Sequence, residues 1–178
     1  MAKITGPNGH VADVDTENRL QTFAIVQNED RHAATEERIW SIYVSITPTD
    51  VNDKFFYLKN TGIKDLFITD ISVSSSVVTQ LIYKHVIGVA VGGADAEVTN
   101  RKLGNVSLPN AIIQESVDFT GLTDVGRFLF EECDIPNSRK DLRIFSTIVI
   151  PQGQAVAFER VAATGLITMV ISLSEDEF

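Results

Sequence analysis

Two acidic clusters hold the side chains best suited to bind a cation or to transfer a proton. Residues 13–18 (Asp-Val-Asp-Thr-Glu-Asn) place oxygen ligands at alternate positions, as an acidic calcium loop does. Such a loop needs glycine at its sixth position, where asparagine stands, and a closing glutamate where Ala24 stands. We therefore expect residues 13–18 to be part of a solvated arm. Glu131 and Glu132 begin the second cluster, which Asp134 completes. Alternation along a strand would place Glu131 and Glu132 on opposite faces, so we expect the second cluster to form a rim or a subunit contact and not a chemical site.

The other reactive side chains are dispersed along the sequence. His10, His32 and His85 lie too far apart for the spacing of a helical metal site, and we expect His85, within a strand, to be partly buried. Cys133 is the single cysteine, so it allows no intramolecular disulfide, and the neighbouring carboxylates disfavour its thiolate. The glycine-rich residues 88–93 have no Gly-Lys-Ser/Thr ending and no helix pattern after them, so we expect a loop and no phosphate cradle. The sequence predicts no enzyme, no cofactor and no metal site.

Net charge narrows the classes of partner. The 178 residues carry a formal charge of −9, of which −4 falls in residues 1–50 and −3 in residues 151–178. An acidic chain is poorly suited to neutralise phosphates or anionic lipid, so we expect neither nucleic acid nor a membrane as partner. The first residues lack a basic stretch followed by an apolar one, and no apolar run approaches a membrane span, which predicts synthesis in a cytoplasm.

Short apolar runs separated by turn residues begin at Arg38 and predict about eight strands and no long helix. Trp40, Ile42, Val44 and Ile46 alternate with polar neighbours, which predicts one buried strand face. The aromatic run at residues 55–57 is expected in the core along with Trp40. The predicted fold is all-β: an antiparallel β-sandwich, jelly-roll-like, over residues 38–178. Its expected strands include residues 54–59 and 66–73, paired as a hairpin, then 80–91, 127–132, 142–150, 155–161 and 166–173.

Residues 1–37 differ from the rest in being polar, with apolar positions too few for a core of their own. They are predicted to form an extended N-terminal arm that orders on a partner. Residues 15–26 would suit either a short helical turn or an extended strand, and the sequence leaves both open.

Four short motifs resemble virion structural proteins of tailed bacteriophages. In the arm, an Asn-Arg-Leu-x-Thr stretch (residues 18–22) precedes a His-Ala pair that begins at His32. The later motifs are Phe-Tyr-Leu-Lys-Asn (56–60), Leu-Phe-Ile-Thr-Asp-Ile (66–71) and Ile-Pro-Gln-Gly (150–153). The resemblance implies a head decoration, or cement, protein: a homo-oligomer, with a trimer favoured, that binds the major capsid protein on the outer surface of the virion capsid. The arm residues expected to bind this partner are Asn18, Arg19, Leu20, Thr22, Phe23 and His32.

Two other classes of function stay open at this point. A tail, connector or fibre-associated protein with receptor or glycan binding would show exposed aromatic and carboxylate side chains at one loop end. An enzyme on a jelly-roll scaffold would require clustered histidines and carboxylates inside the barrel, which the predicted strands do not provide.

Overall fold

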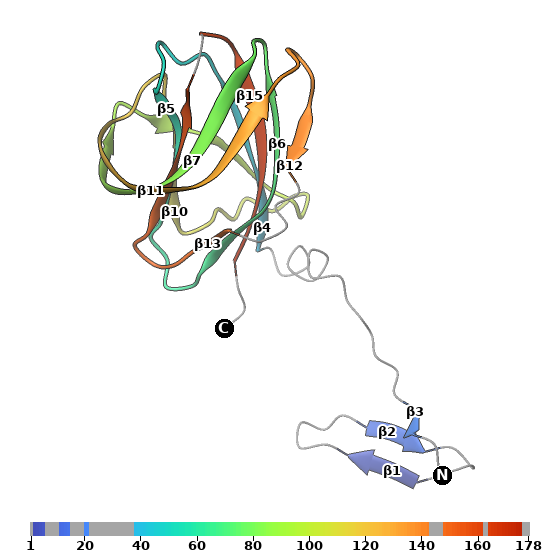
Figure 1. The fold of residues 1–178 in the computed structure, drawn as a ribbon. Helices are drawn as coiled ribbons and strands as arrows, with labels where there is room; N and C mark the ends of the chain where they lie inside the picture. Colours follow the sequence, from blue (N-terminus) through green and yellow to red (C-terminus); the bar gives the residue numbers. More distant parts are fainter. Residues whose placement is uncertain are drawn as a thin grey trace. The chain divides into compact units, whose positions relative to one another are not determined.

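A computed structural model describes residues 2–5, 11–14, 20–21, 38–142, 148–161 and 164–175. These residues form strands and connecting turns, and none of them is helical (Figure 1). The chain divides into two compact units, Met1–Arg31 and His32–Phe178. The first unit lies within the predicted arm, whose last residues, 32–37, fall outside the described ranges.

The first unit contains three short antiparallel strands in the order β1-β2-β3. β1 is Ala2–Thr5, β2 is Val11–Val14 and β3 is Leu20–Gln21. Of the residues for which the sequence left helix and strand open, Leu20–Gln21 is therefore extended, and residues 15–19 and 22–26 lie outside the described residues.

Two antiparallel sheets packed face to face form the second unit, which confirms the predicted all-β sandwich. The first, here the β4 sheet, has the order β12-β6-β15-β4-β9, with β13 also paired to β6. The second, here the β5 sheet, has the order β11-β7-β14-β5-β10-β8. The β4 sheet comprises β4 (Ile39–Ile46), β6 (Leu66–Ser75), β9 (Glu97–Asn100), β12 (Lys140–Leu142), β13 (Ile148–Ile150) and β15 (Ile167–Glu175). The β5 sheet comprises β5 (Lys54–Asn60), β7 (Thr79–Val91), β8 (Ala94–Asp95), β10 (Ala111–Glu115), β11 (Thr120–Cys133) and β14 (Ala155–Arg160).

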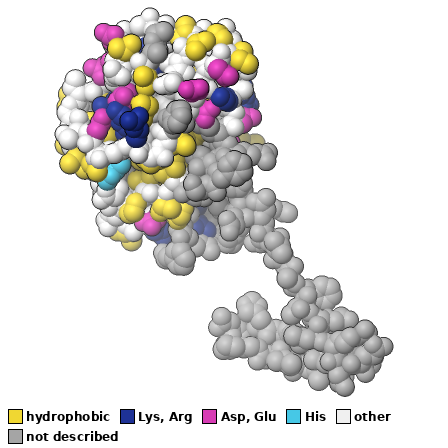
Figure 2. Space-filling model, viewed as in Figure 1, with side chains coloured by type: hydrophobic (Ala, Val, Ile, Leu, Met, Phe, Trp, Pro, Cys, Tyr) yellow, Lys and Arg dark blue, Asp and Glu magenta, His cyan; other side chains and the backbone are white. Residues whose placement is uncertain are grey.

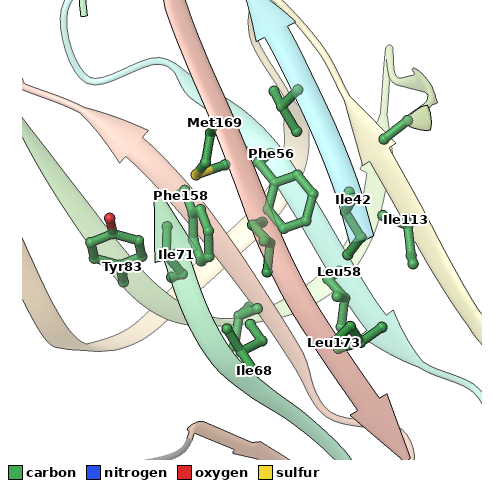
Figure 3. Close-up of a cluster of buried hydrophobic side chains, with 14 of the residues drawn as sticks. Ile42, Phe56, Leu58, Ile68, Ile71, Tyr83, Ile113, Phe158, Met169 and Leu173 are labelled. Carbon is green, nitrogen blue, oxygen red and sulfur yellow. The ribbon is translucent and has the colours of Figure 1, made fainter. Parts of the chain in front are cut away.

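Side chains from both sheets fill the space between them (Figure 3). Phe158 lies at the centre, with its ring centroid 4.9 Å from that of Phe56 and 4.4 Å from that of Tyr83. Trp40, Ile42 and Val44 are buried as their alternation predicted, and Ile46 at the end of the strand is half-buried against the same core. Phe55 and Phe56 are buried in this core, whereas Tyr57 is buried in a second cluster with Phe119. Aromatic and β-branched side chains in contact supply most of the hydrophobic stabilisation of such a core. The opposing β4-sheet residues are Ile42, Ile68, Ile71, Met169 and Leu173.

The predicted hairpin between residues 54–59 and 66–73 is wrong, because β5 and β6 belong to different sheets. The fully buried Asn60 explains the crossing. Its Nδ2 donates to the carbonyls of Lys64 (2.7 Å) and Ile150 (2.8 Å), and its Oδ1 accepts from the Gly62 N–H (2.9 Å). The side chain thereby bonds the β5–β6 connection to the end of β13 and turns the chain toward the other sheet.

Arg160 also holds two strand connections together, at the end of β14 that is far from Asn60. Its side chain is fully buried, and its guanidinium donates to the carbonyls of Gly165 (2.9 Å), Pro48 (3.2 Å) and Asp50 (3.3 Å). Burial lowers the pKa of Arg160, although the negative charges of Asp53 and Asp50 act to raise it. One side chain thus joins the β4–β5 connection to the β14–β15 connection.

The glycine-rich residues 88–93 are not a loop throughout, because residues 88–91 continue β7 alongside β11. Gly88 (φ +108°) and Gly121 (φ +79°) let the two backbones approach closely. A Cβ on Gly88 would lie 2.4 Å from the Gly121 carbonyl oxygen, and one on Gly121 would lie 2.4 Å from the Val89 carbonyl oxygen. β11 is also longer than the predicted strand at 127–132, and of the predicted strand at 142–150 only the two ends lie within the described residues.

Replacing Arg160 with methionine should lower the free energy of unfolding by about 2–4 kcal/mol, because it leaves buried carbonyls without donors. Urea unfolding followed by tryptophan fluorescence measures the change. Arg127→Met is the matched control, since Arg127 is exposed on β11. A loss below about 0.5 kcal/mol for Arg160→Met, similar to the control, would show that the sandwich does not depend on this side chain.

Gly121→Ala should destabilise the protein by about 2 kcal/mol or more, because the added Cβ meets backbone and the residue has a positive φ. Gly126→Ala in the same strand is the control, since a Cβ there meets nothing within 4 Å. Thermal unfolding of the two variants compares them directly. Equal melting temperatures would contradict the close approach of β7 and β11.

Candidate binding surfaces

The predicted partner-binding residues of the arm lie mostly outside the described residues. Leu20 is in β3 and pairs with Val14 of β2. The other predicted residues, which the structure does not describe, are Asn18, Arg19, Thr22, Phe23 and His32. The arm site therefore stays a prediction.

The reactive side chains of the sandwich stay apart. His85 is partly buried, as predicted, and its Nε2 lies 2.9 Å from Gln154 Oε1. Glu131 contacts Lys140 Nζ (2.8 Å), whereas Glu132 accepts from Gln80 Nε2 (2.9 Å), so the two carboxylates have separate partners. Within the described ranges, no three His, Cys, Asp or Glu side chains are grouped so that they could hold a metal ion.

Cys133 is buried at the end of β11. Burial raises the pKa of its thiol, Glu131 and Asp134 raise it further, and Lys140 acts in the opposite direction. The thiol therefore stays protonated at neutral pH, as the neighbouring carboxylates predicted. A hollow of about 270 Å³ beside it is lined by Cys133, Asp134, Ile135, Ser138 and Lys140.

An ion network that the sequence did not reveal crosses four neighbouring strands of the β5 sheet. Lys84 Nζ lies 2.7 Å from Asp124 Oδ2 and 2.6 Å from Glu159 Oε2. Lys54 Nζ lies 3.2 Å from Asp124 Oδ1 and 3.6 Å from Glu159 Oε2. By alternation along β7 and β14, these side chains occupy the face opposite Tyr83 and Phe158. Two cations and two carboxylates balance, so the network is suited to hold the strands together and offers no net charge to a ligand.

The largely apolar hollow beside His85 is the first surface that could take a partner's side chain. Its volume is about 380 Å³, and it lies where β13 of one sheet approaches β7 and β14 of the other. The exposed ring of Phe128 and the amide of Gln154 give it one aromatic and one polar group. The remaining lining residues are Ile148, Val149, Ile150, Pro151, Ala155 and Val156.

The second surface is the 101–110 loop, which connects β9 to β10. Leu103 and Val106 are 93% and 91% exposed, and Leu108 is also exposed. More generally, Figure 2 shows one face of the molecule, on which hydrophobic side chains lie between charged ones. The signal for this loop in the sequence is an Arg-Lys-Leu-Gly-Asn-Val-Ser-Leu-Pro-Asn stretch in which aliphatic residues recur among turn residues, without strand alternation.

Comparisons with models of protein families, with curated proteins and with solved structures give no match to the chain. No helix in the described part of the chain is long and apolar enough to cross a membrane.

Asp124→Asn should destabilise the protein by about 0.5–1 kcal/mol at neutral pH, because it removes the carboxylate shared by Lys54 and Lys84. Burial would raise the pKa of Asp124, but its hydrogen bonds to the two lysines outweigh burial and lower it. The stabilisation is therefore present at pH values above the ordinary aspartate pKa of 3.8, and it is lost as the pH falls through the lower pKa of the folded state.

Urea unfolding near neutral pH and at about pH 2.5 tests this dependence. The difference between wild type and Asp124→Asn should shrink toward zero at the acidic pH. Asp118→Asn is the control, since its carboxylate lies outside the network. A difference that stays constant with pH would contradict a stabilising role of the Asp124 charge.

Proposed function

We propose that the chain is a non-enzymatic head decoration, or cement, protein of a tailed bacteriophage, which binds the major capsid protein lattice and stabilises the head. It would be made in the host cytoplasm and lie on the outer surface of the virion capsid as a homo-oligomer, a trimer being favoured. The observation that carries the proposal is the combination of a separate N-terminal unit, Met1–Arg31, with a closely packed β-sandwich. The resemblance of residues 18–22, 56–60, 66–71 and 150–153 to phage virion proteins supports it.

The rigid sandwich and the separate N-terminal segment meet the physical requirements of a cement protein. A rigid body loses little conformational entropy on binding, and buried side chains such as Asn60 and Arg160 hold the strand connections of this body in place. A separate N-terminal segment can contact a second site on the same lattice. Several weak contacts made at once then give high avidity without a deep pocket.

The strand order also supports the jelly-roll part of the proposal. Many successive strands change sheets: β4 is followed by β5 in the other sheet, β6 by β7, and β13, β14 and β15 alternate in the same way. Within the sheets, β15 lies between β4 and β6, and β14 lies between β5 and β7. Long connections that bring late strands between early ones are typical of Greek keys, two of which make a jelly roll.

The hollow beside His85 favours a second candidate function, that of a tail, connector or fibre-associated protein that binds a receptor or glycan. An exposed aromatic ring, Phe128, stands there with the Gln154 amide, a pairing suited to stack on a sugar and to hydrogen-bond its hydroxyls. Binding of the purified chain to host cells or to their surface oligosaccharides, lost in Phe128→Ala, would favour this candidate over capsid decoration.

Deleting residues 1–36 should leave the sandwich folded but abolish attachment to phage heads, because the N-terminal segment is a separate unit. Co-sedimentation with heads that lack the protein measures attachment, and circular dichroism with thermal unfolding checks the fold. The full chain, assayed in parallel, is the control. Attachment of the truncated protein with unchanged affinity would contradict the role given to the arm.

A further inference from the structure

The second half of β7 continues the core-facing row of its side chains beyond the opposite sheet. Leu81 and Tyr83 are buried in the core, and alternation along the strand places Ile87, Val89 and Val91 on the same face. These last three side chains are 54%, 72% and 57% exposed, so the β4 sheet does not cover them. Together they form an apolar ridge on the surface, here the β7 ridge.

The back of the same strand is packed, which holds the β7 ridge in place. Val86 lies in a buried cluster with Tyr57 and Phe119, and Ala90 packs against that cluster. A strand with one face in solvent normally alternates apolar and polar side chains, whereas a strand covered on both faces is apolar throughout. Residues 86–91 (Val-Ile-Gly-Val-Ala-Val) have the second pattern, although the front of the strand is uncovered in the single chain. The sequence therefore suits a strand whose front is covered by another protein surface.

The largely apolar hollow of about 380 Å³ adjoins the β7 ridge. His85, which lies two residues before Ile87 on the same face, lines this hollow. The exposed side chains of Phe128 on β11 and Val149 on β13 line it as well. One chain therefore presents a projecting apolar ridge and a recessed apolar surface next to each other.

Neither the β7 ridge nor the hollow carries a formal charge. Residues 85–94 contain no Lys, Arg, Asp or Glu, and none of these types is among the described residues that line the hollow. Charged side chains lie at the borders of the two surfaces: Asp95 and Asp118 past the end of the ridge near Gly92, Asp124 and Arg127 beside Lys84 on the opposite face of the sheet, and Lys64 and Asp65, of opposite sign, in the connection that Asn60 bonds to Ile150.

An uncharged contact suits a second copy of this chain. Two copies each carry a net charge of −9, so they approach most favourably where neither surface is charged. A second copy also supplies both halves of the contact, since its ridge projects as the hollow requires and its hollow receives the ridge. A contact between two different patches of one chain forms a closed ring when the rotation between copies allows it.

We infer that the β7 ridge of one copy packs into the hollow beside His85 of the next copy, and that this contact assembles the homo-oligomer. The inference rests on the proposed function, in which the protein is a homo-oligomer, and it adds the surfaces that join the copies. Under the second candidate function, a glycan would occupy the hollow instead.

Sedimentation equilibrium of the full chain tests the inference with matched variants. The ridge variant Ile87→Thr/Val89→Thr places two hydroxyls in the contact and keeps β-branched side chains, which suit a strand. The control is Val78→Thr/Val125→Thr, since both residues are exposed and lie outside the ridge and the hollow. Circular dichroism and thermal unfolding confirm that all three proteins are folded. Co-sedimentation with phage heads that lack the protein measures attachment separately.

The ridge variant should self-associate about a hundredfold more weakly than wild type, because a hydroxyl buried without a partner is costly, and the control should behave as wild type does. Self-association of wild type should strengthen when salt is raised to about 0.5 M, because screening reduces the repulsion between acidic copies and leaves an uncharged contact intact.

Equal self-association of the ridge variant and wild type, a wild type that stays monomeric, or weakening by salt would overturn the inference. Attachment of the protein to heads in those cases would leave capsid decoration standing. A wild type that self-associates through the ridge but does not attach to heads would overturn the proposed function and leave the contact standing. Binding of an oligosaccharide that Phe128→Ala abolishes, with self-association unchanged in that variant, would make a glycan the occupant of the hollow and overturn the choice of a second copy.

Discussion

Two buried polar side chains, Asn60 and Arg160, hold the connections by which the chain passes between the sheets. An unpaired buried amide or guanidinium is costly, so both side chains need hydrogen-bond partners. The amide of Asn60 donates to the carbonyls of Lys64 and Ile150. Nη1 of Arg160 donates to the carbonyl of Gly165 and Nη2 to those of Pro48 and Asp50, while the buried Nε has no partner among the described residues. Each side chain therefore joins connections that are far apart in sequence, at opposite ends of the central β5–β14 pair.

These buried side chains also fix the conformation of neighbouring loops. Asn60 Oδ1 orients the Gly62 N–H, the Thr61 and Gly62 N–H groups bond the Asn110 carbonyl, and Trp40 bonds the Ser107 carbonyl from the core side. The 101–110 loop is thus linked to the interior by a chain of hydrogen bonds. On the outer face of the β5 sheet, the four charges of Lys54, Lys84, Asp124 and Glu159 cancel. The exposed side chains of Leu103, Val106 and Leu108 lie on this loop, at one end of the sandwich.

How far the sequence predicted this arrangement depends on the range of the interactions involved. Alternation in residues 39–46 correctly predicted the buried face of β4, since that pattern depends only on neighbouring residues. The hairpin at 54–73 was wrong because the pairing of β5 with β10 and β14 depends on residues about 50 to 100 positions away. Gly88 looked like part of a loop because its partner, Gly121, is 33 residues further along the chain. The exposure of Leu103 and Val106 was likewise hidden, since aliphatic side chains in a loop can pack inward or point outward.

The central claim is that this chain covers the outside of a phage head by means of a separate N-terminal segment and a rigid β-sandwich. Cryo-electron microscopy of particles from the source, at a resolution that separates β-strands, tests it most directly. The claim predicts density for the two-sheet body at symmetry-related positions on the outer surface of the capsid. Density for the body at the tail or connector, or intact particles that do not contain the chain, would contradict it.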